Sequence, residues 1–104
     1  MAENSNFAVP LRVETGRLVL RMFRQDDWRA LHEYYSDAEC MRFTFRRPLS
    51  ESSTWRMVAT MAGQWLLRGY GPYAVEDKAT GAVLGAVGLW YPLEWPEPEI
   101  KWAL

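Results

Sequence analysis

The chain has 104 residues, of which 49% are hydrophobic and 24% are charged, and its formal net charge is -1. This length allows one domain with a single core, and the apolar content excludes a wholly disordered chain. Twelve basic residues against thirteen acidic ones leave no overall field that would attract nucleic acid or an anionic membrane surface. We therefore expect one globular domain with neither of these partners.

The chain contains one cysteine, Cys40, and one histidine, His32. A single cysteine cannot form an intramolecular disulfide, and one residue of each kind is too few to predict a metal site. The start of the chain lacks the basic and apolar regions of an export signal, and the longest apolar run is about half a membrane span. These features predict a cytoplasmic protein without a metal, and neither Cys40 nor His32 is assigned a role.

The N-terminal part of the chain changes character near Glu14. Residues 1–13 have no periodic pattern, so we expect a loose leader. An alternation with a period of two follows, which predicts a first strand. The side chains expected on its core face are Leu18, Leu20 and Met22.

Two amphipathic helices are predicted next. Asp26 and Asp27 open the first helix, because short carboxylates accept hydrogen bonds from free amides and favour the positive end of the dipole. Ser50 is the expected N-cap of the second helix, which ends at Gly69. The apolar stripes are Trp28, Leu31 and Tyr35 in the first helix, and Trp55, Val58, Met61 or Ala62, Trp65 and Leu66 in the second, opposite Arg56, Thr60, Gln64 and Arg68.

The segment between the helices, residues 42–48, is a predicted loop. Its arginines at 42, 46 and 47 can contact a phosphate or a base, but a solvated loop is the favoured interpretation. Phe43 and Phe45 in this loop are either core aromatics or walls of a binding site.

The longest uncharged run, residues 82–91, is predicted to be a central strand. A glycine-containing turn at residues 77–81 joins it to residues 72–76 as a β-hairpin. A helix is the competing interpretation, but Gly85 and Gly88 would each destabilise it by roughly 1 kcal/mol. In a strand these glycines indicate a bulge or tight packing contact, or else the close approach of a ligand.

Prolines at 92, 96 and 98 predict a loop, after which residues 99–104 alternate again with Ile100, Trp102 and Leu104 facing one way. Short connections make the last three strands antiparallel. The predicted class is α+β: a mostly antiparallel sheet of about four strands, with two amphipathic helices between the first and second strands covering one face.

Four phrases in a fixed order resemble a known family. They are TGRLVLR at residues 15–21, SDAECMRF at 36–43, DKATG at 77–81 with GAVGL at 85–89, and EIKWAL at 99–104. Together they resemble the GNAT superfamily of acetyl-CoA-dependent N-acetyltransferases, in the branch similar to ribosomal-protein and aminoglycoside N-acetyltransferases. The resemblance makes residues 14–104 the N-terminal half of such a domain, with an incomplete GNAT-like fold.

The resemblance implies transfer of an acetyl group from acetyl-CoA to a primary amine. The acceptor stays open between a protein N-terminus, an amino acid, a polyamine and an antibiotic. In the family a glycine-rich turn and a helix that bind the cofactor pyrophosphate follow the fourth strand. The chain ends before that turn, so we expect the 104 residues to be inactive alone.

Site residues follow from the resemblance. The backbone of Trp102, Ala103 and Leu104 is expected to lie against the pantetheine arm and thioester of acetyl-CoA. Glu99 is the candidate general base, with an exposed strand carboxylate as the alternative. Phe43, Trp90 and Tyr91 are assigned to the acceptor site, and acidic residues at 94, 97 and 99 with tryptophans at 90, 95 and 102 can attract a cationic amine.

A second hypothesis is a non-catalytic interaction module. Its last strand would leave an unpaired edge, and its tryptophans would form an exposed patch. This hypothesis predicts a homodimer in which residues 98–104 are buried by the partner.

Overall fold

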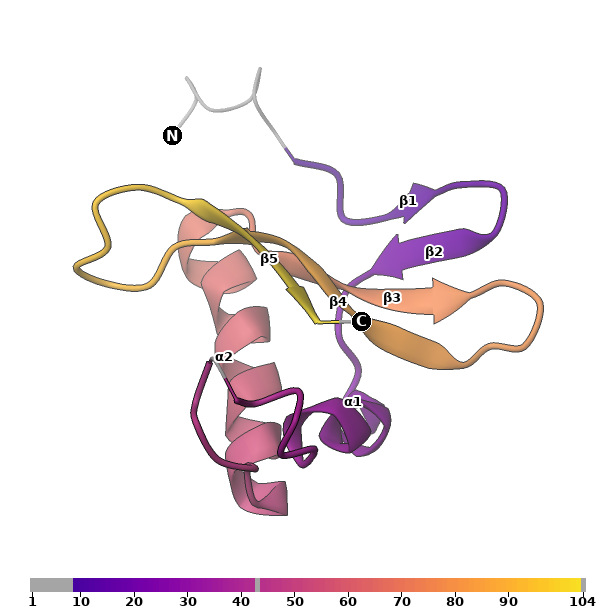
Figure 1. The fold of residues 1–104 in the computed structure, drawn as a ribbon. Coiled ribbons are helices and arrows are strands. Elements are labelled where there is room, and N and C mark those ends of the chain that lie inside the picture. Colours follow the sequence, from indigo (N-terminus) through magenta and orange to yellow (C-terminus); the bar gives the residue numbers. More distant parts are fainter. Residues whose placement is uncertain (1–8, 43, 104) are drawn as a thin grey trace.

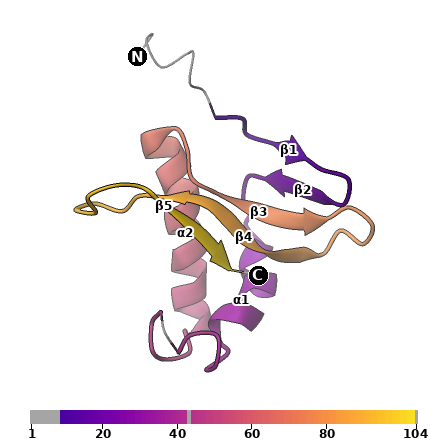
Figure 2. The ribbon, with the colours of Figure 1, turned by 45° about the horizontal axis from the view of Figure 1, so that its top comes forward.

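The computed structural model describes residues 9–42 and 44–103. A five-stranded antiparallel sheet has the strand order β1-β2-β3-β4-β5, and both helices lie on one side of it (Figures 1 and 2). The elements are β1 (Val13–Glu14), β2 (Leu18–Arg21), α1 (Asp27–Tyr35), α2 (Glu51–Arg68), β3 (Pro72–Asp77), β4 (Val83–Trp90) and β5 (Glu99–Ala103). The α+β class is confirmed, and the two-residue β1 adds a fifth strand to the predicted four.

The core lies between the helices and small residues of the sheet. Ala86 of β4 and Ala103 of β5 are paired across the two strands and are almost fully buried. They pack with α1 and α2 in one cluster whose helical members are Leu31, Tyr35, Val58 and Met61. Small side chains on this face let both helices approach the sheet closely.

The predicted core face of the first strand was wrong. Val19 and Arg21 are the buried residues of β2, whereas Leu18, Leu20 and Met22 are only half-buried. Side chains alternate between the faces of a strand, and Arg21 points to the helical side, where it meets α1. The alternation was predicted correctly, but the face that is buried against the helices is the opposite of the predicted one, because it carries the charged residue Arg21.

Buried Arg21 joins three elements through its guanidinium group. Its Nη1 and Nη2 donate to the two carboxylate oxygens of Asp27 in α1 at 2.9 and 3.0 Å, and its Nε donates to Glu76 of β3 at 2.6 Å. Asp27 also accepts a hydrogen bond from the backbone amide of Arg24 at 2.7 Å. Asp27 therefore opens α1 through these bonds, while Asp26 occupies the N-cap position without the side-chain bond expected of it.

The second helix has its predicted ends but not its full predicted stripe. The Ser50 hydroxyl accepts from the Ser53 amide, and Gly69 adopts the left-handed conformation at the C-cap, so both ends are confirmed. Trp55 and Leu66, expected in the core, are 49% and 86% exposed. The side of the helix that faces the core instead includes polar residues that have hydrogen-bond partners. Thr54 is bonded to His32 at 2.7 Å, and Gln64 is bonded to the backbone of β4 and of the residue that follows it.

Gly88 brings β4 into close contact with the chain that enters β3. A Cβ atom at this position would lie 2.7 Å from Gly71 O and from Pro72 Cα, and the φ angle of Gly88 is +152°. A register shift between Val75 and Glu76 on β3 disturbs the same hairpin near Gly85. A tight packing contact at Gly88 and a bulge beside Gly85 are thus both present.

We expect Gly88→Ala to lower the free energy of unfolding by about 2 kcal/mol, because the methyl group meets backbone atoms and φ is unfavourable. Gly63→Ala is the matched control: this helical glycine has no heavy atom within 4 Å of the added Cβ, so alanine should stabilise by ~0.5–1 kcal/mol. Urea unfolding of both variants measures the difference. Equal stability of the two variants would contradict the close contact.

We expect Arg21→Met to lower the free energy of unfolding by about 3–5 kcal/mol, because it leaves the buried Asp27 carboxylate without its partner. Arg24→Met is the control, since Arg24 has a 67% exposed side chain and only a 4.0 Å contact with Glu76. Its loss should cost less than about 1 kcal/mol in the same denaturation experiment. Similar losses in both variants would show that burial of the Arg21 pair has no special effect.

Candidate functional site

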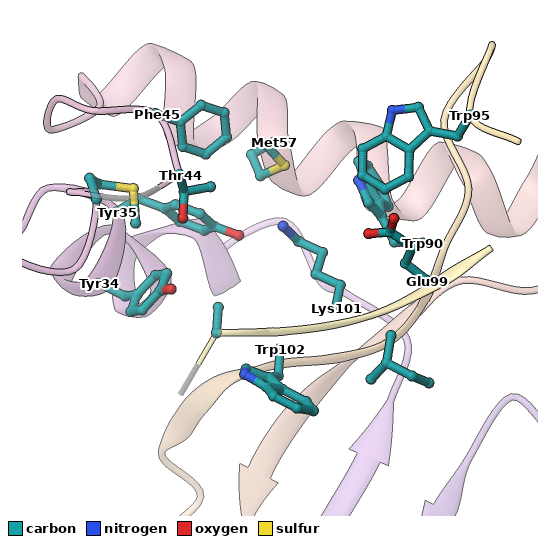
Figure 3. A pocket seen from close by; sticks show the side chains of 13 residues that line it. Tyr34, Tyr35, Thr44, Phe45, Met57, Trp90, Trp95, Glu99, Lys101 and Trp102 are labelled. Atoms are coloured by element: carbon teal, nitrogen blue, oxygen red, sulfur yellow. The ribbon is translucent and has the colours of Figure 1, made fainter. Parts of the chain in front are cut away.

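A cavity of about 610 Å³ lies on the helical side of β5, between this strand, the end of α1 and the loop that precedes α2 (Figure 3). Aromatic rings make much of its wall, and its polar side chains include Thr44, Glu99 and Lys101. The aromatic residues on the helical side and the proline-rich loop are Tyr34, Tyr35, Phe45, Trp90 and Trp95. The cavity is large enough for a small polar molecule or the end of a peptide.

Lys101 of β5 extends into this cavity (Figure 3). Its Nζ lies 5.2 Å from the ring centroid of Trp90 and 5.9 Å from that of Tyr35. On the neighbouring strand the residue opposite is Gly88, which has no side chain to compete for this space. Burial lowers the pKa of Lys101, because removal from water disfavours the charged ammonium group.

Tyr35, the last residue of α1, is 1% exposed, and its ring makes T-shaped contacts with the rings of Tyr34 and Phe45. Within residues 9–42 and 44–103, its hydroxyl is the buried side-chain polar atom that has no hydrogen-bond partner. Burial raises the pKa of Tyr35, so the hydroxyl keeps its proton and can donate it to an acceptor. Figure 3 shows this hydroxyl pointing toward the Lys101 ammonium group.

The residues predicted for catalysis and cofactor binding separate onto the two sides of β5. Glu99 is exposed and lies on the cavity side, near Trp90 (Figure 3). The Trp102 side chain lies on the opposite side and is 69% exposed, whereas Ala103 is buried in the core. Leu104, the third predicted cofactor residue, is outside the described residues. The prediction that Ile100 and Trp102 share a face agrees with their exposure, which is 61% for Ile100.

The residues predicted for the acceptor also divide. Trp90 lines the cavity beside β5, and Phe43 is outside the described residues. Tyr91 instead lines a second cavity of about 590 Å³ next to the C-terminal half of α2, where the Arg68 guanidinium lies 4.3 Å from its ring centroid. Of the tryptophans at 90, 95 and 102, the first two lie on the cavity side of β5 and the third lies on the opposite side (Figure 3).

Gln64 of α2 fixes the end of β4 from which Trp90 and Tyr91 project. Its side-chain amide donates to Leu89 O at 3.2 Å and to Tyr70 O at 3.1 Å, and its oxygen accepts from the Tyr91 amide at 2.9 Å. The bonds to Leu89 and Tyr91 hold the strand end against the helix, and the bond to Tyr70 holds the segment that precedes β3. The helical pattern alone assigned Gln64 to the solvent side and so missed this role.

Lys101 was also missed as a site residue. The available signal was its position: it is two residues from Glu99 and two from Ala103, and so shares their face in an alternating strand. Its neighbours across the cavity, Tyr35 of α1 and Trp90 of β4, lie outside residues 99–104, so the spacing within that segment does not indicate them.

The described part of the chain contains no helix that is both long and apolar enough to cross a membrane. Among the same residues no group of three or more histidine, cysteine or acidic side chains is arranged to hold a metal ion. Cys40 is exposed, and its pKa is raised by desolvation and by the nearby Asp37 carboxylate, which makes the thiolate less available.

Comparison with known proteins agrees with this geometry. Among solved structures, an acetyltransferase from Agrobacterium tumefaciens str. C58 is 25% identical and superposes with a TM-score of 0.73 over 92% of this chain and 54% of its own. A GNAT-family acetyltransferase from Bacillus anthracis is 23% identical and has the same fold, with a TM-score of 0.69 over 88% of this chain and 52% of its own. The chain thus spans about half the length of these structures. Residues 17–104 match the acetyltransferase (GNAT) domain family, and because this match takes in both helices and β2 to β5, the chain belongs to that family.

Proposed function

We propose that the chain is the N-terminal half of an enzyme that transfers an acetyl group from acetyl-CoA to a primary amine of a small molecule or peptide. The observation that carries the proposal is the combination of a GNAT-type β5 at the edge of the sheet with an acidic residue, Glu99, at the mouth of an aromatic cavity. Residues 14–104 would belong to the catalytic domain, after a leader of residues 1–13. We also propose a cytoplasmic location, which a single cysteine supports.

The free side of β5 fits the pantetheine arm of acetyl-CoA. In the strand order β5 pairs only with β4, so along the described residues its other side presents backbone N–H and C=O groups without a neighbouring strand. An extended arm with amide groups can pair with such an edge as an added strand would. The backbone of Trp102 and Ala103, continued by Leu104, would hold the arm, and an amide of this segment would stabilise the oxyanion of the reacting thioester carbonyl.

Acetyl-CoA supplies the activated acetyl thioester when it is bound. Glu99 would accept a proton from the acceptor ammonium, directly or through a water molecule, and so make the amine nucleophilic. The amine nitrogen would then attack the carbonyl carbon and the carbon–sulfur bond would break. The leaving thiolate of CoA would take the proton that the attacking nitrogen loses, so that CoA departs as the thiol. Trp90 and Phe43 would border the acceptor and keep its amine next to Glu99.

Calorimetric titration with acetyl-CoA tests the proposal. The titration uses residues 1–104 and a form extended beyond Leu104 by a glycine-rich turn and a helix, the family elements that bind pyrophosphate. We expect binding by the extended form, together with release of CoA in the presence of primary amines. If neither form binds acetyl-CoA, the proposed activity is wrong.

We expect Glu99→Gln in the active form to lower kcat/KM by roughly 100-fold, because glutamine cannot accept the ammonium proton. Glu33→Gln is the control: this residue is also exposed, but it lies on α1 and does not line the cavity. Its kcat/KM should stay within about twofold, since exposed charges outside the reacting groups contribute little. Initial rates of thiol release over a pH series measure both variants, and equal effects would remove Glu99 from the mechanism.

Self-association is a second candidate function, favoured by the apolar face of the sheet. Leu89 and Ile100 are paired on β4 and β5, and they lie beside Trp102, with exposures of 38%, 61% and 69%. Large apolar side chains gathered in this way are typical of a surface that another chain or segment covers. A second copy could cover it and pair along the free side of β5.

We expect Trp102→Ser to weaken any such dimer by at least tenfold, because it removes the largest exposed apolar side chain of this face. Leu67→Ser is the control, since Leu67 is 84% exposed on α2, away from β5. Sedimentation equilibrium over a range of protein concentrations gives the dissociation constants. A chain that remains monomeric up to about millimolar concentration, where even weak specific contacts are populated, contradicts this second function.

A further inference from the structure

The ammonium group of Lys101 has no anionic partner among the residues that the structure describes. Its interactions are with the faces of Trp90 and Tyr35, and no carboxylate is within ion-pair distance. Aromatic faces attract a cation, but they do not satisfy the three N–H donors of an ammonium group as oxygen acceptors do. A half-buried lysine therefore points unused donors into the cavity.

The Tyr35 hydroxyl is a second unused donor at the same place. It is buried and has no partner in the described part of the chain, and it points toward Lys101 (Figure 3). Buried polar groups are almost always hydrogen-bonded. An unsatisfied hydroxyl next to an unpaired ammonium group therefore indicates that a bound ligand supplies the hydrogen-bond acceptor. The two donors come from different elements, α1 and β5, which the core holds in a fixed relation.

We propose that Lys101 and Tyr35 bind a carboxylate group of the acceptor, so that the substrate is a primary amine that also carries a carboxylate. The inference rests on the proposed acetyl transfer and narrows its acceptor. The carboxylate accepts hydrogen bonds from the Lys101 ammonium and the Tyr35 hydroxyl, a combination that is stronger than neutral hydrogen bonds because both partners of one bond are charged. A polyamine or an aminoglycoside instead brings a further positive charge toward Lys101 and is disfavoured.

The position of Glu99 predicts the orientation in which such an acceptor binds in the cavity. Glu99 and Lys101 are two residues apart on the same side of β5, which separates their Cα atoms by about 6.6 Å. An acceptor with an ammonium at one end and a carboxylate at the other can therefore meet both charges along the strand. The amine would lie at Glu99, where the proton is removed, and the carboxylate would lie deeper, at Lys101.

Two ligands of similar length, which differ in whether they carry a carboxylate, test the contribution of that group to binding. γ-Aminobutyrate has one amine and one carboxylate, and 1,4-diaminobutane has two amines. Lys78 and Lys101 are the two lysines of the chain, so 13C-lysine labelling gives two side-chain signals, and Lys78 in the β3–β4 turn is an internal reference. We expect γ-aminobutyrate to shift the Lys101 signal saturably while the Lys78 signal stays unchanged, and we expect 1,4-diaminobutane to bind at least tenfold more weakly.

Variants of the same chain identify the donors. Lys101→Met keeps most of the length of the side chain but removes the ammonium group, and it should weaken γ-aminobutyrate binding at least tenfold. Tyr35→Phe should weaken it severalfold, and Lys78→Met should leave it unchanged. Urea unfolding checks that each variant folds. If Lys101→Met does not fold, the Lys101 signal of the unaltered chain decides by itself: the absence of a saturable shift overturns the proposal.

Two further results would overturn it: binding of the diamine as tight as that of the amino acid, or a Lys101→Met variant that retains its affinity for γ-aminobutyrate within twofold. The titrations contain no acetyl-CoA, so they can fail while acetyl transfer to another acceptor survives. Conversely, failure of the acetyl-CoA titration with retained γ-aminobutyrate binding would show a carboxylate site without the proposed enzyme. The two failures are therefore distinguishable.

Discussion

The buried guanidinium of Arg21 is the constraint on which the position of the first helix depends. It binds Asp27 at the start of α1 and Glu76 of β3 from its own place on β2, so one residue ties the helix to two strands. With its first residue held there, α1 runs so that its last residue, Tyr35, enters the core cluster beside Ala103 of β5. The ion pair at the start of α1 thus helps to position Tyr35, at the end of the helix, in the wall of the cavity.

The sheet has two faces of different character, and the difference organises the site. Toward the helices it presents small residues such as Ala74, Ala86 and Ala103, and this is where Lys101 and Glu99 project beyond the core. Away from the helices it presents larger apolar side chains, among them Ile100 and Trp102. Because β5 takes part in both faces and also forms an edge of the sheet, one short strand contributes to the aromatic cavity, to a backbone edge without a neighbouring strand and to an exposed apolar surface.

Local signals in the sequence predicted much of the architecture. The hairpin around residues 77–81, the cap at Ser50 and the end of α2 at Gly69 depend on neighbouring residues, and all three are present. Which face of a strand is covered depends on partners from other elements: Arg21 is buried because it pairs with Asp27 of α1 and with Glu76 of the neighbouring strand β3. The setting of Lys101 likewise comes from Tyr35 and Trp90, so neither alternation nor composition could reveal it.

The strand order of the sheet is the order of the strands along the chain, and this has a consequence for folding. Each strand pairs with the one before it, through short connections everywhere except between β2 and β3, where both helices intervene. Bringing β2 and β3 together therefore carries the largest loop-closure entropy in the sheet, and contacts of this range slow folding. The Arg21–Glu76 pair spans that junction, so the hairpin of β3 and β4 can form early, whereas α1 takes its final place only when the long connection closes.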